Sequence, residues 1–140
     1  MEKIKEYALG KIDENASLFT EVSDKIWEYA ELSLKEYQSA ALYTDMLKKL
    51  GFETEENICG IKTAFTGTYG SGKPVIGILA EFDALSGLSQ VGGLCEQKEL
   101  VTDGCGHGCG HNMLGAGSLA AAYAVKCWLE KTGKDGTVIF

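Results

Sequence analysis

The fold is decided by the stretch VIGILAEFD at residues 75–83. The unbroken apolar run over 75–80 is typical of a strand buried on both faces inside a parallel or mixed sheet. Glu81 and Asp83 follow at the carboxyl end of this strand, where α/β proteins place their functional sites. Because side chains alternate along a strand, we expect both carboxylates to point to the same side. The glycine-rich stretch over 83–110 shows no periodicity, and its length predicts a functional loop.

The residues around this strand predict helices before it and one helix after it. In chain order, the predicted elements are helices over 4–33 and 35–50, alternating strands over 52–55 and 61–69, the buried strand 75–80, a helix over about 112–131 and a buried strand over 137–140. Gly51 and Gly133 fall where helix C-terminal caps belong. The alanine-rich helix has a face slim enough to pack closely on a sheet. This order predicts a three-layer α/β/α sandwich. Since the sequence stops within an apolar strand, we expect that sandwich to be incomplete at its C-terminal end.

Composition narrows the class of protein. With 140 residues and 45% hydrophobic residues, the chain can form one compact domain with a buried core. Its net charge of −7 argues against a nucleic-acid partner, which requires a basic surface. No secretory signal and no apolar run long enough for a membrane span is present, so we expect a cytoplasmic protein with reduced thiols. Among the cysteines, Cys59 and Cys127 are predicted to be buried packing residues.

The motif DGCGHGCGHN at residues 103–112 contains both histidines of the chain and two of its cysteines. Thiolate and imidazole are the usual ligands of zinc and similar metals, and the intervening glycines allow side chains two residues apart to converge. The start of the following helix would lower the pKa of a nearby thiol. These residues therefore predict a metal site, although a cysteine or histidine in such a turn can also simply pack or cap the helix.

Two of these stretches, ILAEFDAL at 78–85 and HGCGHN at 107–112, resemble the M20 metallopeptidases. The similarity is greatest to the amidohydrolase branch that contains aminobenzoyl-glutamate hydrolases and N-acyl-amino-acid hydrolases. ELSLKEY at 31–37 and LGF at 50–52 also resemble the opening helices of that family. The resemblance implies a sandwich of the zinc-peptidase type, with residues 1–140 as the N-terminal part of a single catalytic domain and a dimerisation domain lying beyond this chain.

The resemblance also implies site residues. Cys109 and His111 match the family's first two metal ligands, and Asp83 matches the aspartate that supports the metal site in catalysis. Glu81 stands where other branches carry a histidine ligand, and His107 matches a residue near the metal. Their roles stay open.

Two further positions depart from the motif. Asn112 replaces the aspartate that commonly follows Cys-Gly-His. Cys105 is an addition, either an alternative ligand or a small buried residue.

The implied activity is hydrolysis of the amide bond of an N-acyl amino acid, an aminobenzoyl-glutamate-like compound or another small dipeptide-like substrate. It would use one or two divalent ions, Zn or Mn, in each full-length protomer of an expected homo-oligomer. The general base, a glutamate, is expected outside this chain, so residues 1–140 alone are expected to be inactive. Two alternatives remain: a non-catalytic metal-binding or scaffold segment, and thiol chemistry with Cys105 or Cys109 as nucleophile and His107 as base.

Overall fold

The computed structural model describes residues 2–140, which form helices packed on a four-stranded sheet. Its elements are α1 (Glu2–Glu14), α2 (Ala16–Tyr29), α3 (Tyr37–Lys49), β1 (Glu53–Glu56), the 3-10 turn η1 (Ile58–Gly60), β2 (Phe65–Ser71), β3 (Val75–Gly77), α4 (His111–Thr132) and β4 (Gly136–Ile139). Within the described residues, no helix is both long and apolar enough to cross a membrane.

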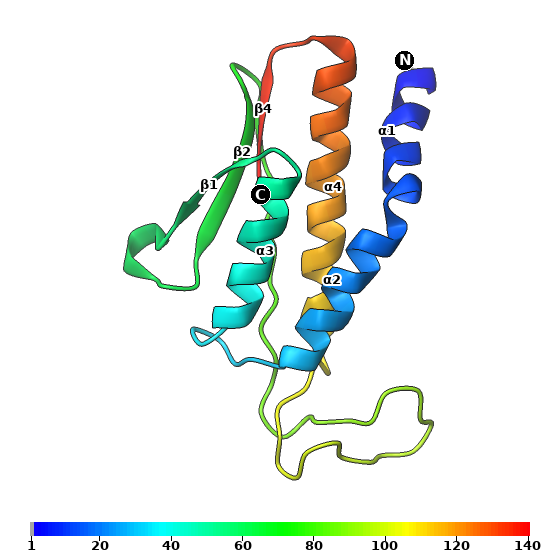
Figure 1. Ribbon diagram of the computed structural model, residues 1–140, viewed down its shortest axis with the longest axis vertical. Coiled ribbons are helices and arrows are strands. Elements are labelled where there is room, and N and C mark those ends of the chain that lie inside the picture. Colours follow the sequence, from blue (N-terminus) through cyan, green and yellow to red (C-terminus); the bar gives the residue numbers. More distant parts are fainter. Residues whose placement is uncertain (1) are drawn as a thin grey trace.

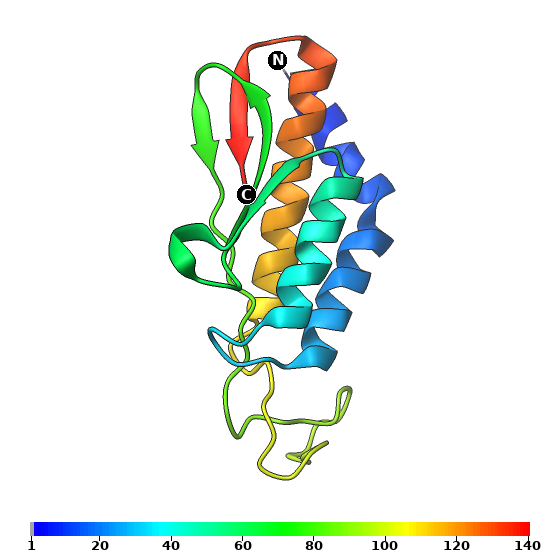
Figure 2. The same cartoon turned by 60° about the vertical axis from the view of Figure 1, so that its left-hand side comes forward.

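The strands lie in the order β1-β2-β4-β3. β2 pairs antiparallel with both β1 and β4, whereas β3 pairs parallel with β4. The helices gather on one side of this sheet, and the loop between β3 and α4 projects beyond the first turn of α4 (Figures 1 and 2). The predicted α/β class is confirmed, in the form of an incomplete sandwich with a sheet and one helical layer.

The core lies between the helical layer and the sheet, and it carries the segment that leads to the site. Tyr43 of α3 is fully buried, with ring centroids 5.1 Å from Phe82 and 5.7 Å from Phe140. Phe65 of β2 stacks on the same ring at 6.1 Å. These aromatic contacts connect α3 with β2, the end of β4 and the segment after β3. They therefore fix the backbone from which Glu81 and Asp83 project.

The slim face predicted for the alanine-rich helix is present at Gly115, near the start of α4. A Cβ atom there would lie 2.3 Å from the Tyr43 hydroxyl and 3.0 Å from the backbone oxygen of Glu81. The first distance is shorter than any normal Cβ contact and the second is tighter than most, so a larger residue here would force Tyr43 to shift. The first turns of α4 thus lie directly against the segment that carries the two carboxylates.

The continuous helix predicted over 4–33 is wrong, because the chain breaks at Asn15 and leaves the helix before Ser33. Asn15 has φ −114° and ψ 18°, and its side-chain amide donates to the Lys11 carbonyl at 2.9 Å. Asparagine competes for backbone partners in this way, which favours a break between two helices. α2 then ends at Tyr29, and Ala30 takes the left-handed conformation that closes it.

The strand predicted over 61–69 begins later, at Phe65, because residues 58–64 close on themselves. The Ile58 amide donates to the Ala64 carbonyl and the Ala64 amide to the Ile61 carbonyl. Cys59 lies in this turn and is exposed, so its predicted burial is wrong. Cys127 is buried in α4 as predicted.

The strand predicted over 75–80 is not buried on both faces. β3 covers only Val75–Gly77 and is an edge strand, with Val75 57% exposed. It pairs with β4 alone, and the helical layer covers one face only, so its apolar side chains stay open to solvent. Beyond β3 the chain still alternates: Ile78 packs on the core, while Leu79 is 83% exposed.

Candidate metal centre

The backbone around Asp83 is anchored on two sides. The Ala84 amide donates to the Glu31 carbonyl at 2.7 Å. Leu85 and Gly106 exchange backbone hydrogen bonds of 3.0 and 2.9 Å as an antiparallel bridge. The bridge places the end of the glycine-rich loop, just before His107, beside the residues that follow Asp83. Segments distant in the sequence are thereby brought to the start of α4.

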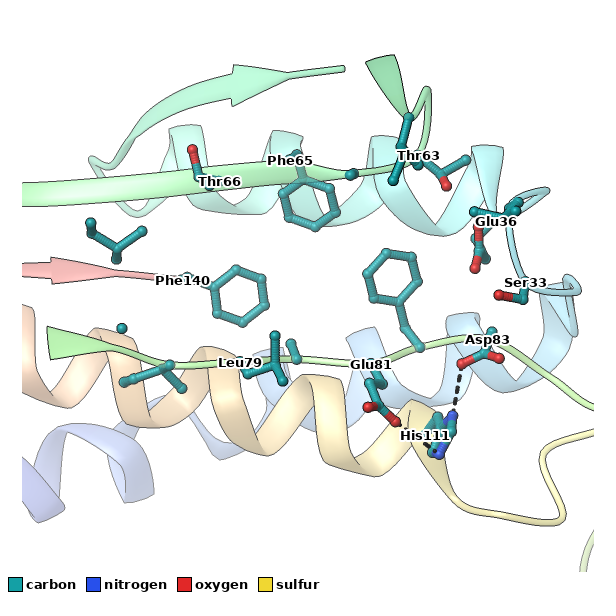
Figure 3. Close-up of a pocket in the computed structure, with 18 residues that line it drawn as sticks. Ser33, Glu36, Thr63, Phe65, Thr66, Leu79, Glu81, Asp83, His111 and Phe140 are labelled. Carbon is teal, nitrogen blue, oxygen red and sulfur yellow. Dashed lines mark hydrogen bonds and ion pairs between the residues drawn. The ribbon is translucent and has the colours of Figure 1, made fainter. Parts of the chain in front are cut away.

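His111, the first residue of α4, lies between the two predicted carboxylates. Its Nδ1 is 2.8 Å from Asp83 Oδ1, and its Nε2 is 3.2 Å from Glu81 Oε2 (Figure 3). The prediction that Glu81 and Asp83 point to the same side is confirmed, since both contact one imidazole ring. The Asp83 side chain is 25% exposed and that of Glu81 is 52% exposed, so the shorter contact is also the less hydrated one.

The two contacts differ in what they do to the ring. A carboxylate only accepts hydrogen bonds, so the short Asp83 contact places a proton on Nδ1. Nε2 then either carries a second proton, which it donates to Glu81, or presents a lone pair toward that carboxylate. A lone pair facing a carboxylate is stable only with a positive charge between them, from a proton or a metal cation. Histidines that bind metals commonly donate their other ring nitrogen to a carboxylate in this manner.

Cys109 is exposed and lies two residues before His111, separated from it by Gly110 at the N-terminal cap of α4. In chemical type, its thiol and the His111 imidazole fit a divalent metal of the zinc kind. In number they fall short of the usual three protein ligands. Among the side chains that the structure describes, no three of His, Cys, Asp or Glu are placed so that they could hold one ion. The chain therefore offers part of a ligand set.

His107 points away from this pair, toward α2. Its Nε2 lies 3.0 Å from the Ile26 carbonyl oxygen, so Nε2 carries the proton and donates it. Its Nδ1 is buried and has no hydrogen-bond partner among the described residues. Burial lowers the pKa of His107, outweighing the opposing effect of the Ile26 hydrogen bond. Neither ring nitrogen forms a hydrogen bond with a thiol of the described residues, which disfavours His107 as the base of a cysteine nucleophile.

The Asp83–His111 pair lies at one end of a groove of about 840 Å³ between β2 and the segment 78–82. Phe65, Leu79 and Phe140 line its middle, and Ser33, Glu36 and Thr63 lie near Asp83 (Figure 3). Sequence reasoning missed these last three. Glu36 is 7% exposed, and its Oε2 has no hydrogen-bond partner within the described chain. No sequence signal marks it, because a glutamate at the start of a predicted helix is ordinarily solvated.

Comparison with known proteins gives several close matches, although no model of a protein family matches the chain. It is 44% identical to one of the subunits of the p-aminobenzoyl-glutamate hydrolase of Escherichia coli, over 100% of this chain and 29% of that protein. It is also 38% identical to thermostable carboxypeptidase 1 of Saccharolobus solfataricus, over 74% of this chain and 26% of that protein. The chain thus spans less than a third of the length of these relatives.

Two solved structures share the fold. A proposed aminohydrolase from methicillin-resistant Staphylococcus aureus superposes with a TM-score of 0.71 and 26% identity, covering 91% of this chain and 32% of that one. A dinuclear metal-binding peptidase of the M20 family from Bacillus subtilis superposes with a TM-score of 0.69 and 25% identity, covering 89% of this chain and 33% of that one. The chain is therefore similar along its whole length to a hydrolase subunit and shares the fold of an M20 family peptidase, over about a third of the length of each.

Proposed function

We propose that the protein carrying this chain is a metal-dependent amidohydrolase that cleaves the amide bond of an N-acyl amino acid or an aminobenzoyl-glutamate-like compound. The observation that carries the proposal is His111, held by Asp83 at Nδ1 with its Nε2 turned to Glu81. The 44% identity to a component of an aminobenzoyl-glutamate hydrolase supports the substrate class.

Cys109 and His111 are the residues of this chain that would hold a divalent cation, Zn or Mn, with one or two ions per full-length protomer. When bound, such a cation acts as a Lewis acid toward the amide carbonyl. Asp83 keeps the proton on His111 Nδ1 and fixes the ring plane, which leaves Nε2 as the coordinating nitrogen. Glu81 adds negative charge on the Nε2 side. The general base and the remaining ligands would come from outside residues 1–140.

The reaction partner is a small molecule, and nothing in this acidic chain favours a nucleic acid or a membrane surface. We expect the protein to act in the cytoplasm. We expect the whole protein to be a homo-oligomer.

One observation favours a second function for the 140-residue chain by itself. No three potential ligands among its described residues are placed so that they could hold one ion, so alone it would act as a metal-binding or scaffold segment without turnover. The whole protein would differ by retaining stoichiometric metal through dialysis and by hydrolysing amides.

The test uses the protein at the full length of its relatives, assayed with aminobenzoyl-glutamate and a panel of N-acyl amino acids. We expect activity that a chelator removes and Zn²⁺ or Mn²⁺ restores. Cys109→Ser combined with His111→Ala should abolish both bound metal and hydrolysis. Unchanged metal content by elemental analysis in the double variant would remove these residues as ligands, and chelator-resistant turnover would remove the metal mechanism.

A further inference from the structure

Two side chains that flank the Cys109–His111 turn reach the same helix. On one side, His107 donates from Nε2 to the Ile26 carbonyl at 3.0 Å. On the other, Asn112 donates from Nδ2 to Ser23 Oγ at 3.0 Å, with the Ser23 carbonyl at 3.4 Å. The two acceptors stand three residues apart in α2, so they lie on one face of that helix, one turn from each other.

Both acceptor residues lie in the interior, although the His107 contact itself is only partly buried. Ile26 is fully buried, Ser23 is 8% exposed and Asn112 is 6% exposed. A hydrogen bond lost there leaves a polar group without water to replace its partner, so each anchor costs more to break than a surface contact. The α2 end is itself fixed, because Val22 and Ile26 belong to the core shared with α4. The anchors therefore attach to a rigid support.

Between the anchors, His111 contacts Asp83 and Glu81, whereas residues 108–110 make no side-chain hydrogen bond within the described chain. Gly108 and Gly110 give the backbone freedom, and Cys109 is exposed. Within the turn, the Gly110 amide donates to the His107 carbonyl at 3.2 Å, which closes it locally without attaching it to the rest of the chain. Beyond the contact of His111 with Asp83, the side chains that attach the turn to the body of the protein are those of residue 107 before it and residue 112 after it.

We propose that His107 and Asn112 are positioning residues that hold the Cys109–His111 turn on α2, so that thiolate and imidazole are presented together to the metal. This inference rests on the proposed function. Both side chains act as hydrogen-bond donors to α2. An aspartate at 112 would keep the shape of the side chain but place a carboxylate against the Ser23 carbonyl, while a glutamine at 107 can place an amide N–H near the position of Nε2.

The test uses the full-length protein loaded with Co²⁺, whose absorption includes a thiolate-to-metal band when a cysteine is bound. The variants form matched pairs: His107→Phe, which lacks a donor, against His107→Gln, which restores one, and Asn112→Asp against wild type. Because a merely structural role would move stability alone, Phe52→Leu at the far end of the sheet serves as a destabilised control. Thermal unfolding, Co²⁺ affinity and the thiolate band are measured for each.

We expect His107→Phe and Asn112→Asp to weaken Co²⁺ binding by about 10- to 100-fold, the range for residues that orient metal ligands, and to reduce the thiolate band at saturating Co²⁺. His107→Gln should retain most of both, and Phe52→Leu should lower the melting temperature with affinity unchanged. Wild-type Co²⁺ affinity and a full thiolate band in His107→Phe and Asn112→Asp would overturn the positioning role but not the proposed function. The positioning role would also be overturned if Phe52→Leu lost Co²⁺ affinity in proportion to its fall in melting temperature, as the other variants do. A wild-type protein without a thiolate band would overturn the proposed ligand set too.

Discussion

Replacing Asp83 by asparagine tests the central contact of the site with the smallest change of shape. Asparagine keeps an acceptor oxygen near the place of Oδ1 but loses the charge that holds the proton on His111 Nδ1. In the structure that contact is 2.8 Å long and only partly hydrated, with Asp83 25% exposed. The substitution should therefore weaken the orientation of the imidazole without opening a cavity.

The size of the effect follows from the strength of this hydrogen bond. Hydrogen bonds to charged groups contribute about 1.5–3 kcal/mol net. At about 1.4 kcal/mol per tenfold change, loss of the charge should weaken metal binding by about 10- to 100-fold. Glu81→Gln is the matched control, because its contact is longer, at 3.2 Å, and its side chain is 52% exposed. Exposed ion pairs are worth about 0.2–1 kcal/mol, which limits the expected loss to about fivefold.

The assay is competition for Zn²⁺ against a calibrated chelator, with the full-length protein and both variants, alongside hydrolysis rates at saturating metal. Asp83→Asn should show the larger loss of affinity, with melting temperature nearly unchanged. Equal affinity in Asp83→Asn and wild type would return Asp83 to an ordinary residue at a strand end. A larger loss in Glu81→Gln would show instead that Glu81 is the carboxylate on which the site depends.

Three further predictions concern the fold. Glu31 accepts hydrogen bonds from the Gln38 and Ser39 amides at the start of α3; burial alone would raise its pKa, but these bonds lower it below its ordinary value of 4.5. Ionised Glu31 therefore stabilises the fold above its unfolded-state pKa, and this is lost as pH falls through the lower folded-state value. Glu31→Gln should lower the free energy of unfolding by about 1–2 kcal/mol near neutral pH, as for a lost helix cap. It should also make that free energy, measured by urea unfolding at a series of acidic pH values, depend less on pH, and an unaltered pH dependence would contradict this. Gly115→Ala should destabilise by about 1–3 kcal/mol through overpacking against Tyr43, while Gly117→Ala, with open space around its Cβ position, should be neutral or stabilising, and equal melting temperatures would refute the close approach. The 140-residue chain alone should be catalytically silent and self-associate through the exposed β3 edge, and Val75→Lys should reduce the association seen by size-exclusion chromatography; metal-dependent turnover by a monomer would contradict both expectations.

Elements with a strong periodicity of apolar residues and a clear glycine signal at their ends were predictable from the sequence. The succession of strands along the chain agrees with the structure. The predicted helix ends at Gly51 and Gly133 also agree, because glycine there supplies a left-handed conformation, at φ +84° and +62°. The break at Asn15 was missed because the apolar spacing continues across it. The burial of 75–80 was misjudged because an apolar run shows what a strand can bury, whereas burial depends on which elements cover it.

At the site, local strand geometry determines the direction of some side chains, and tertiary contacts determine the direction of others. Glu81 and Asp83 are two residues apart on an extended backbone, so their common direction follows from local geometry, and both reach His111. The contacts of His107 with Ile26 and of Asn112 with Ser23 join residues separated by 81 and 89 positions. No local pattern encodes such pairs, which exist only because α2 and α4 pack side by side.

That packing explains how one short motif can do two things. Within residues 107–112, the side chains at 107 and 112 turn inward to α2, while His111 turns to the carboxylates after β3 and Cys109 remains exposed. Gly108 and Gly110 let His107 and Cys109 leave the backbone in different directions, and His111 and Asn112 diverge because they are neighbours in α4. The glycines that first indicated converging ligands thus also separate His107, which holds the turn in place, from Cys109, which would hold the metal.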